Sequence, residues 1–94
     1  IFNLEGYSNA VSTACAAGTQ AIGEAYEVIL RGDADIMLAG GAEAPFCETT
    51  LGGFCNMHAL TSQNDNPKMA SKPFDKNRDG FVPSEGSAVI VLEK

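Results

Sequence analysis

The residue most able to do chemistry in this sequence is Cys15, in the stretch VSTACAAGT. A β-branched run ends at this cysteine and small, helix-tolerant residues follow at once, which predicts a thiol where a strand gives way to a helix. The unpaired N–H groups and the positive dipole end of a helix start favour the ionised form of a thiol. Cys15 is therefore a candidate nucleophile; the alternative is a small buried hydrophobe, as free cysteines commonly are.

A second group of chemically capable side chains lies in DKNRDGFVPSEG. Four residues match positions 1, 3, 5 and 6 of the calcium loop D-x-[DN]-x-[DN]-G-x5-E: Asp75, Asn77, Asp79 and Gly80. The match fails at position 12, where Gly86 replaces the bidentate glutamate and Glu85 falls one place early. We therefore expect Asp75, Arg78 and Asp79 to bind each other and nearby backbone groups and so to hold a long loop.

The elements around Cys15 are predicted to be a strand, a helix and a second strand. Ser8 to Thr13 is interpreted as a short strand, and apolar residues recur at helical spacing from Ala16 to Arg31, with Gly32 at the expected C-terminal cap. The apolar run IMLAG that follows is typical of a strand covered on both faces. This order predicts a right-handed β-α-β unit with parallel strands. The small residues in the first half of the helix allow another backbone to approach closely, and they predict that this half is buried.

The rest of the sequence is dominated by turn residues. GGAEAP is interpreted as a loop, and Thr49 to Leu60 as a short helix weakened by Gly52 and Gly53. Residues 61–86 are rich in Asn, Asp, Gly and Pro and predict a long irregular connection, which in a small chain is usually functional or a sign of missing neighbours. The final SAVIVLE predicts a strand.

Composition excludes several classes of function. Twelve acidic and six basic residues give a net charge of −6, so a nucleic-acid backbone or an anionic membrane is not an expected partner. No stretch approaches the roughly 18 apolar residues that span a bilayer. Three cysteines without a C-x-x-C pair suggest neither a disulfide framework nor a zinc site, and favour a reducing compartment, the cytoplasm. The start without methionine suggests a part of a larger protein.

Three blocks in the same order resemble one family: VSTACAAGTQAIGEAYEVILRGDADIMLAGGAEA, LTSQNDNP and SKPFDKNRDGFVPSEGSAVIVLE. They are similar to the β-ketoacyl-acyl-carrier-protein synthases, the condensing enzymes of the thiolase superfamily, from about Tyr7 to Lys94. The resemblance implies an α/β fold class, as part of a thiolase-like layered αβαβα fold with a mostly parallel sheet. Residues 1–94 would then form part of the N-terminal half of a synthase domain, its nucleophile-bearing core.

The resemblance also implies roles for individual residues. Cys15 would accept the acyl chain as a thioester, and its backbone N–H would form half of an oxyanion hole. Phe54 matches an aromatic that borders the acyl pocket, with an ordinary core position as the alternative. His58 stands where relatives commonly carry an arginine at the carrier-docking surface, so we expect it to face an acyl carrier protein. Ser8 to Thr13 matches a strand that pairs across a two-fold axis, which implies a homodimer.

The implied activity is decarboxylative Claisen condensation of an acyl thioester with malonyl-acyl carrier protein in fatty-acid chain elongation, without a cofactor or a metal. Three alternatives differ in their chemistry: a polyketide ketosynthase, a thiolase-like enzyme acting on coenzyme A thioesters, against which the downstream blocks argue, and a calcium-binding module at Asp75, Asn77 and Asp79. The two histidines and the lysine that the family uses for decarboxylation lie beyond this chain. The chain alone is therefore expected to be inactive, and to aggregate because apolar surface would be exposed. Cys47 and Cys55 are interpreted as packing residues.

Overall fold

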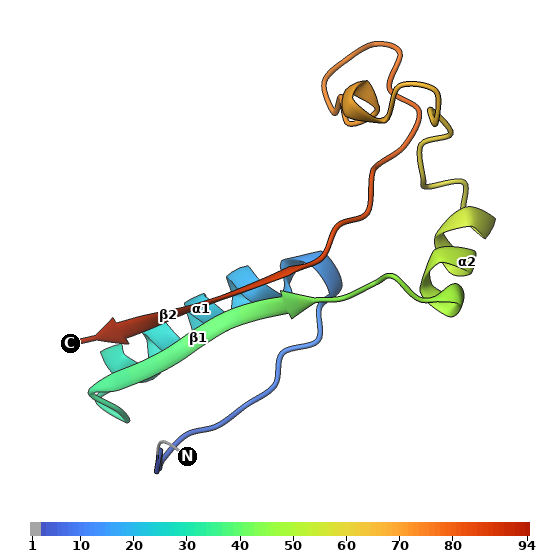
Figure 1. Cartoon of the computed structure of the whole chain (residues 1–94). Helices are drawn as coiled ribbons and strands as arrows, with labels where there is room; N and C mark the ends of the chain where they lie inside the picture. The colour runs from blue at the N-terminus through green and yellow to red at the C-terminus, as the bar shows by residue number, and fades with distance from the viewer. Residues whose placement is uncertain (1–2) are drawn as a thin grey trace. The chain divides into compact units, whose positions relative to one another are not determined.

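Residues 3–94 are described by the computed structural model of this chain, in two units. The first unit contains Ile1–Ala42 and Ser87–Lys94, and the second contains Glu43–Gly86. Figure 1 shows a long helix with two strands in the first unit, and a short helix with mostly irregular chain in the second. Each unit is described below by itself.

The first unit is built from helix α1 (Ala17–Leu30), strand β1 (Ile36–Glu43) and strand β2 (Gly86–Glu93). The two strands form one two-stranded sheet, and their arrows run in opposite directions in Figure 1. Ala25 and Val28 of α1 and Ala39 of β1 are the buried apolar residues of this unit. Their burial places the core between one side of the helix and one face of the sheet.

Close approach of the α1 and β1 backbones depends on two glycines. A Cβ added at Gly41 would lie 3.2 Å from the Cα of Gly18. Side chains at these positions would hold the two elements apart, so the absence of a Cβ at both lets the first turns of α1 lie directly on β1. The sequence prediction of close backbone approach is confirmed here.

The predicted burial of the first half of the helix is only partly correct. Ala17, Gly18 and Ala21 are half-buried, whereas Ala16 and Gly23 are exposed. The fully buried positions, Ala25 and Val28, lie in the second half of α1. Small residues let the backbones meet but cover little surface themselves, so the larger Val28 side chain occupies the core.

The helix prediction is confirmed, including its end. α1 begins at Ala17, after a 3-10 turn over Ala14–Ala16, and Gly32 follows with φ +79°. The N–H of Gly32 donates to Ile29 O (2.9 Å) and the N–H of Asp33 to Val28 O (3.1 Å). These two bonds form a Schellman motif, which satisfies carbonyls that the helix end leaves free.

The predicted β-α-β unit is wrong for the residues that the structure describes. Ser8 to Thr13 contains no strand, and every residue there except Val11 is exposed. The two strands that do form are antiparallel, because the chain leaves the end of β1 and enters β2 at the same end of the pair. A continuous apolar run predicts a covered strand but not its direction. The predicted loop GGAEAP is also shorter than expected, since β1 extends to Glu43.

The second unit contains helix α2 (Glu48–Asn56) and a 3-10 turn at Pro67–Met69 in a long irregular chain. The predicted short helix is thus confirmed, with an earlier end. An isolated parallel bridge joins Leu60 and Phe81, with Thr61 N donating to Phe81 O (3.1 Å) and Phe81 N donating to Ala59 O (3.0 Å). These bonds close the two ends of the irregular connection on each other.

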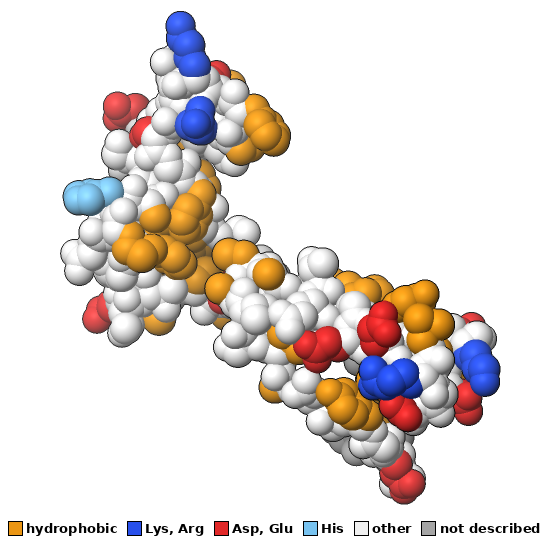
Figure 2. All heavy atoms as spheres, turned by 180° about the vertical axis from the view of Figure 1, so that it is seen from behind, with side chains coloured by type: hydrophobic (Ala, Val, Ile, Leu, Met, Phe, Trp, Pro, Cys, Tyr) orange, Lys and Arg blue, Asp and Glu red, His pale blue; other side chains and the backbone are white. Residues whose placement is uncertain are grey.

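Apolar side chains remain exposed in both units, as Figure 2 shows for one face of the molecule. Val89 is 68% exposed on β2, and Phe74 is 99% exposed in the second unit. Aggregation of the isolated chain stays a prediction, and these residues are the surface on which it depends. None of the helices between residues 3 and 94 has the length and apolar character needed to cross a bilayer.

Candidate functional site: the Cys15 turn

The chain turns sharply just before Cys15. Thr13 has φ −122° and ψ 37°, and Ala14 has φ +53°, a left-handed conformation that residues with a Cβ rarely adopt. The 3-10 helix η1 (Ala14–Ala16) then begins, and its N–H groups at Ala16 and Ala17 donate to Thr13 O and Ala14 O. This conformation costs about 1 kcal/mol or more for an L-residue, and such outliers concentrate at functional sites.

Cys15 is exposed at this turn, at the start of the chain's longest helix. Its N–H comes one residue before the Ala16 N–H, the first donor of the turn, so the turn itself provides no acceptor for it. A thiol with a free neighbouring N–H can attack a carbonyl carbon while the N–H binds the oxygen that becomes negative. The predicted place of Cys15 at a helix entrance is confirmed, although an unpaired segment takes the place of the expected strand.

Cys47 occupies a second helix start that sequence reasoning did not identify. It is the N-cap of α2, and its Sγ lies 3.2 Å from Thr50 Oγ1. Hydrogen bonding by the Thr50 side chain, aided by backbone bonds from Thr50 and Thr49, lowers the pKa of Cys47 below its ordinary value. The sequence carries no clear signal for this start, because cysteine is not among the preferred cap residues and threonine does not complete a capping box. Cys47 and Cys55 are both exposed, so their interpretation as packing residues is wrong here.

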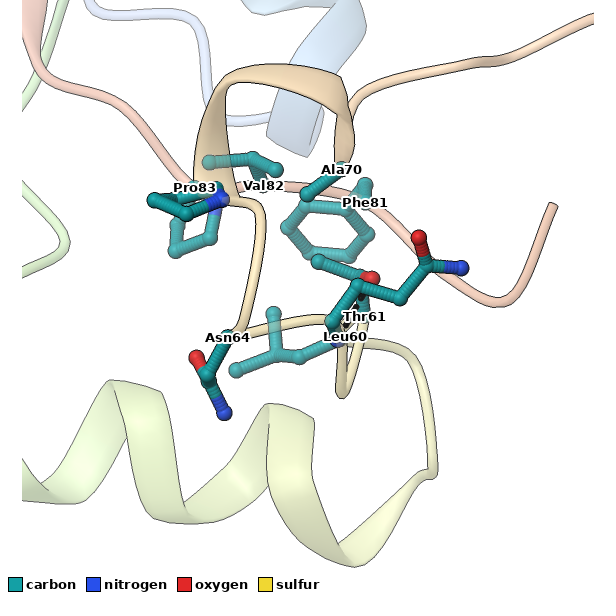
Figure 3. A pocket seen from close by; sticks show the side chains of 9 residues that line it. Leu60, Thr61, Asn64, Ala70, Phe81, Val82 and Pro83 are labelled. Atoms are coloured by element: carbon teal, nitrogen blue, oxygen red, sulfur yellow. Dashed lines mark hydrogen bonds between the residues drawn. The ribbon is translucent and has the colours of Figure 1, made fainter.

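Phe54 lies on α2 and packs against Phe81. The ring centroids are 5.1 Å apart with an interplanar angle of 85°, an edge-to-face pair. Beside this pair is a cavity of about 230 Å³, lined by Phe81 but not by Phe54 (Figure 3). Leu60, Val82 and Pro83 give the cavity apolar walls, and Thr61 and Asn64 contribute polar groups. The acyl-pocket role of Phe54 stays a prediction, while its packing role is established.

His58 ends α2 in a left-handed conformation, with φ +53°. The N–H of His58 donates to Cys55 O (2.9 Å) and the N–H of Ala59 to Phe54 O (3.1 Å). These bonds make the same Schellman motif that ends α1, but with histidine at the position where glycine is preferred. His58 is exposed, so its side chain is available to a partner.

The calcium-loop candidates do not converge on one point. Both oxygens of Asp79 accept bonds from a different segment: Thr61 Oγ1 donates to Oδ1 (2.7 Å), and Ser62 N and Oγ donate to Oδ2 (3.2 Å each). The pKa of Asp79 is lowered, mainly by the hydrogen bond from the Thr61 hydroxyl. Desolvation acts in the opposite direction but is the smaller effect. Asp75 instead accepts a bond from the Asn77 N–H (2.7 Å).

The expected loop-holding role is therefore correct for Asp79, with Thr61 and Ser62 as partners that the sequence did not indicate. Arg78 bonds to the backbone oxygen of Asp75 through Nη1 (3.2 Å), in agreement with the predicted backbone contacts. Among the described residues no salt bridge joins Arg78 to the Asp75 or Asp79 carboxylate, so the expected pairing of these side chains with each other is wrong. Within residues 3–94 no group of three or more His, Cys, Asp or Glu side chains is arranged to hold a metal ion. The geometry favours a structural reading of DKNRDGFVPSEG over a calcium loop.

The functional candidates fall into the two units of the chain. Cys15 belongs to the first unit, whereas Phe54 and His58 lie near the end of α2 in the second. Phe54 O is the acceptor in the motif that positions His58, so these two residues are linked through the backbone.

Comparison with known proteins gives one consistent family. A 3-oxoacyl-[acyl-carrier-protein] synthase 2 from Rhizobium meliloti is 51% identical over 92 residues, covering 97% of this chain and 22% of that protein. A synthase 2 from Synechocystis is 47% identical over 90 residues, covering 96% and 22%. This chain thus spans about a fifth of the length of the curated relatives that it matches.

Solved structures agree with the sequence relatives. A type II polyketide ketosynthase in complex with its acyl-carrier protein has a TM-score of 0.88 and 46% identity, covering 93% of this chain and 22% of that chain. A beta-ketoacyl synthase from Burkholderia phymatum has a TM-score of 0.84 and 46% identity, covering 89% and 20%. The family described as "Beta-ketoacyl synthase, N-terminal domain" matches residues 1–94, and the chain belongs to this family.

Proposed function

We propose that the protein carrying this chain extends acyl chains by decarboxylative Claisen condensation with malonyl-acyl carrier protein, in fatty-acid elongation. The observation that carries the proposal is an exposed cysteine on a left-handed turn at a helix start, in a chain 51% identical to a 3-oxoacyl-[acyl-carrier-protein] synthase 2. Residues 1–94 would be part of the N-terminal half of the synthase domain, in a thiolase-like layered fold. The exposed strand residues of β2 are consistent with further layers in such a fold.

The first step assigns a nucleophile to this chain. The Cys15 sulfur attacks the carbonyl carbon of an acyl-carrier thioester and forms a new sulfur–carbon bond. The carbonyl oxygen becomes negative in the tetrahedral intermediate, where the Cys15 N–H would stabilise it. The bond to the carrier's sulfur then breaks, and that sulfur leaves and takes up a proton, so the acyl chain remains on Cys15 as a thioester.

The second step forms the new carbon–carbon bond. Malonyl-acyl carrier protein loses carbon dioxide, and the carbanion that remains attacks the carbonyl carbon of the acyl-Cys15 thioester. The Cys15 sulfur is expelled, and the product is a β-ketoacyl chain on the carrier, two carbons longer. By family resemblance, the histidines and the lysine that assist decarboxylation belong to the part of the protein beyond this chain. Cys15 therefore contributes the acyl-transfer half of the reaction.

Labelling with a radioactive acyl thioester tests this proposal on the full-length protein. The wild-type protein and a Cys55→Ala control should retain covalent label after denaturation, and Cys15→Ala should retain none. Peptide mapping should place the acyl group on the Cys15 peptide. Label that survives in Cys15→Ala would refute the assignment.

A polyketide ketosynthase is the second candidate, because a structural relative with a TM-score of 0.88 has that role and was captured with its acyl-carrier protein and a hexaketide. The two candidates differ in the acyl chain that Cys15 accepts. A fatty-acid enzyme should prefer a saturated acyl primer, and a polyketide enzyme a poly-β-keto primer. A labelling reaction that contains both primers at equal concentration separates the two functions, because the acyl group found on Cys15 shows which primer the protein prefers.

The proposal includes an acyl carrier protein as partner, with His58 at the docking surface, because His58 is exposed at a constrained helix end. His58→Glu should weaken binding of an acidic carrier and leave acylation by a small-molecule thioester unchanged. A homodimer in the full-length protein also belongs to the proposal, supported by the unpaired segment Ser8 to Thr13.

The cytoplasm is the proposed compartment, on the basis of three unpaired cysteines. A Schizosaccharomyces pombe relative, 48% identical over 94 residues, has "mitochondrial" in its name. Fractionation of the source cells, followed with an antibody to this chain, distinguishes the two locations.

A further inference from the structure

The segment that leads to Cys15 is attached to helix α1 by one side-chain bridge. Asn9 Nδ2 donates to Glu24 Oε2 (3.0 Å), and Gln20 Nε2 donates to Glu24 Oε1 (2.7 Å). The half-buried Glu24 carboxylate thus receives one amide donor on each oxygen. A carboxylate that accepts two bonds in this way fixes the positions of both donors.

The orientation of the Asn9 amide follows from its own neighbours. Asn9 Oδ1 accepts a bond from the Ala10 N–H (2.8 Å), so the oxygen of the amide is already committed to the backbone. The amide nitrogen must then point to Glu24, which as a carboxylate accepts bonds only. The three side chains are therefore complementary donors and acceptors, and a reversed amide would break two bonds at once.

The bridge encloses the Cys15 turn. Asn9 and Glu24 are fifteen positions apart, and the strained Ala14 and Cys15 lie between them. Within residues 3–13, the side-chain hydrogen bond from Asn9 to Glu24 is the one that joins the segment to another element. Residues 3–13 form no helix or strand. Closing a loop restricts the conformations open to the residues within it, so the bridge limits the directions in which the turn can present its thiol.

We propose that Asn9, Glu24 and Gln20 form a positioning bridge that sets the orientation of the Cys15 turn, with Glu24 as its centre. This inference rests on the proposed function, in which Cys15 is the nucleophile. The bridge residues touch neither the acyl chain nor the carrier. They act through the backbone of residues 9–15, and loss of the bridge lowers the reactivity of Cys15 without removing the thiol.

A polarity swap tests the bridge on the full-length protein. Asn9→Asp places two carboxylates against each other and should slow alkylation of Cys15 by iodoacetamide by about threefold to tenfold, less than the full effect of a lost bond to a charged group, because the bridge acts on Cys15 only through the backbone. In Asn9→Asp with Glu24→Gln, the acid and the amide exchange places at constant net charge, and the rate should return to within about twofold of wild type. Glu27→Gln removes one charge from the same helix and should change nothing.

The readout is the ratio of Cys15 to Cys55 alkylation in the same molecules, measured by peptide mass spectrometry, with the unfolding midpoint of each variant. Glu24→Gln alone, a milder change, serves if Asn9→Asp does not fold. An unchanged ratio in these variants, or a fall that the swap does not restore, overturns the positioning bridge. If wild-type Cys15 is no more reactive than Cys55, both the proposed function and the positioning bridge are wrong. If Cys15 is more reactive than Cys55 but its alkylation rate is unchanged in the bridge variants, only the positioning bridge is wrong.

Discussion

Each α-helix between residues 3 and 94 begins within two residues of a cysteine, but the two cysteines are held differently. Cys47 caps α2 with an extended backbone, φ −132° and ψ 158°, and its sulfur lies beside the Thr50 hydroxyl. Cys15 sits inside a 3-10 turn whose first residue is left-handed, and the first turns of the helix that follows lie directly on a strand. The surroundings of Cys47 change the pKa of its thiol, whereas the turn at Cys15 sets the direction in which its thiol faces.

This difference shows that a cysteine at a helix start is not by itself a catalytic signature. The pKa of Cys47 is lowered by a local side-chain hydrogen bond, yet the proposed nucleophile is Cys15. The surroundings of Cys15, the proposed nucleophile, differ in backbone geometry: a strained turn and a helix whose first turns pack against β1 through glycines. Variants at the two sites test whether this geometry, and not the helix start alone, separates them.

The largest effect is expected from the strand beneath α1. A Cβ at Gly40 would collide with the Ala88 carbonyl oxygen and lie 2.8 Å from the Val89 Cα, and these are backbone atoms of β2 that cannot rotate away. Gly40→Ala should therefore lower the free energy of unfolding by about 3 kcal/mol, the upper range for overpacking. Urea unfolding of the full-length protein measures it.

The matched control lies on helix α2. A Cβ at Gly52 of α2 meets nothing within 4 Å. Gly52→Ala should stabilise the protein by about 0.5–1 kcal/mol, since glycine is entropically costly inside a helix. Equal free energies of unfolding for the two variants would mean that the packing difference between these two glycine positions is not real.

The next effect concerns the turn itself. Ala14 has φ +53°, which a β-branched side chain tolerates poorly. Ala14→Val should lower the free energy of unfolding by about 2 kcal/mol and slow acylation of Cys15, whereas Ala14→Gly should relieve strain and keep acylation. Thermal unfolding and acyl labelling of both variants decide this. A valine variant that is as stable and as active as the glycine variant argues against the left-handed turn as the device that presents Cys15.

A smaller effect is expected at Cys47, where a side-chain hydrogen bond changes the pKa of the thiol and the backbone is not strained. Thr50→Val removes the hydroxyl that lowers the pKa of Cys47, so this pKa should rise toward its ordinary value. The thiolate fraction at a given pH then falls, and the pH–rate curve for Cys47 alkylation moves to higher pH, with rates about threefold to tenfold lower below its midpoint. Thr49→Val keeps its backbone bond and should leave the curve in place. A Thr50→Val curve that coincides with wild type would falsify the hydroxyl as the cause.

The sequence predicted what depends on local patterns around these cysteines. Helix α1 and its glycine end follow from apolar spacing and from Gly32, and β1 and β2 from continuous apolar runs. Cys15 was found as a candidate because a β-branched run and small residues meet there. Its assignment as nucleophile came from family resemblance, which no spacing rule supplies.

What the sequence missed depends on distant partners. Ser8 to Thr13 has the composition of a strand but no neighbour to pair with, and the direction of β2 is set by where the connecting chain returns. The partners of Asp79 are Thr61 and Ser62, eighteen and seventeen positions away, and the Asn9–Glu24 bridge spans fifteen. Pairing at such separations has no short-range signature, because it is decided by tertiary structure.

The smallest effect concerns the other ends of the two helices, which share one motif but differ in one residue. Gly32 ends α1 at φ +79°, and His58 ends α2 at φ +53°, each with the same pair of hydrogen bonds. Glycine adopts this conformation at no steric cost, whereas histidine carries a Cβ. His58→Gly should therefore raise the free energy of unfolding by about 0.5–1 kcal/mol, and Gly32→Ala should lower it by a similar amount.

The same variant connects the strain at His58 to function. If the imidazole is kept at a glycine position because it meets the carrier, His58→Gly should stabilise the protein and also weaken carrier binding, as expected where a functional side chain is retained against stability. Calorimetric titration of the full-length protein with its acyl carrier protein gives the binding term, and urea unfolding gives the stability term. A gain in stability with unchanged carrier affinity would show that His58 is not kept for carrier binding. The strained end of α2 would then have no explanation in docking.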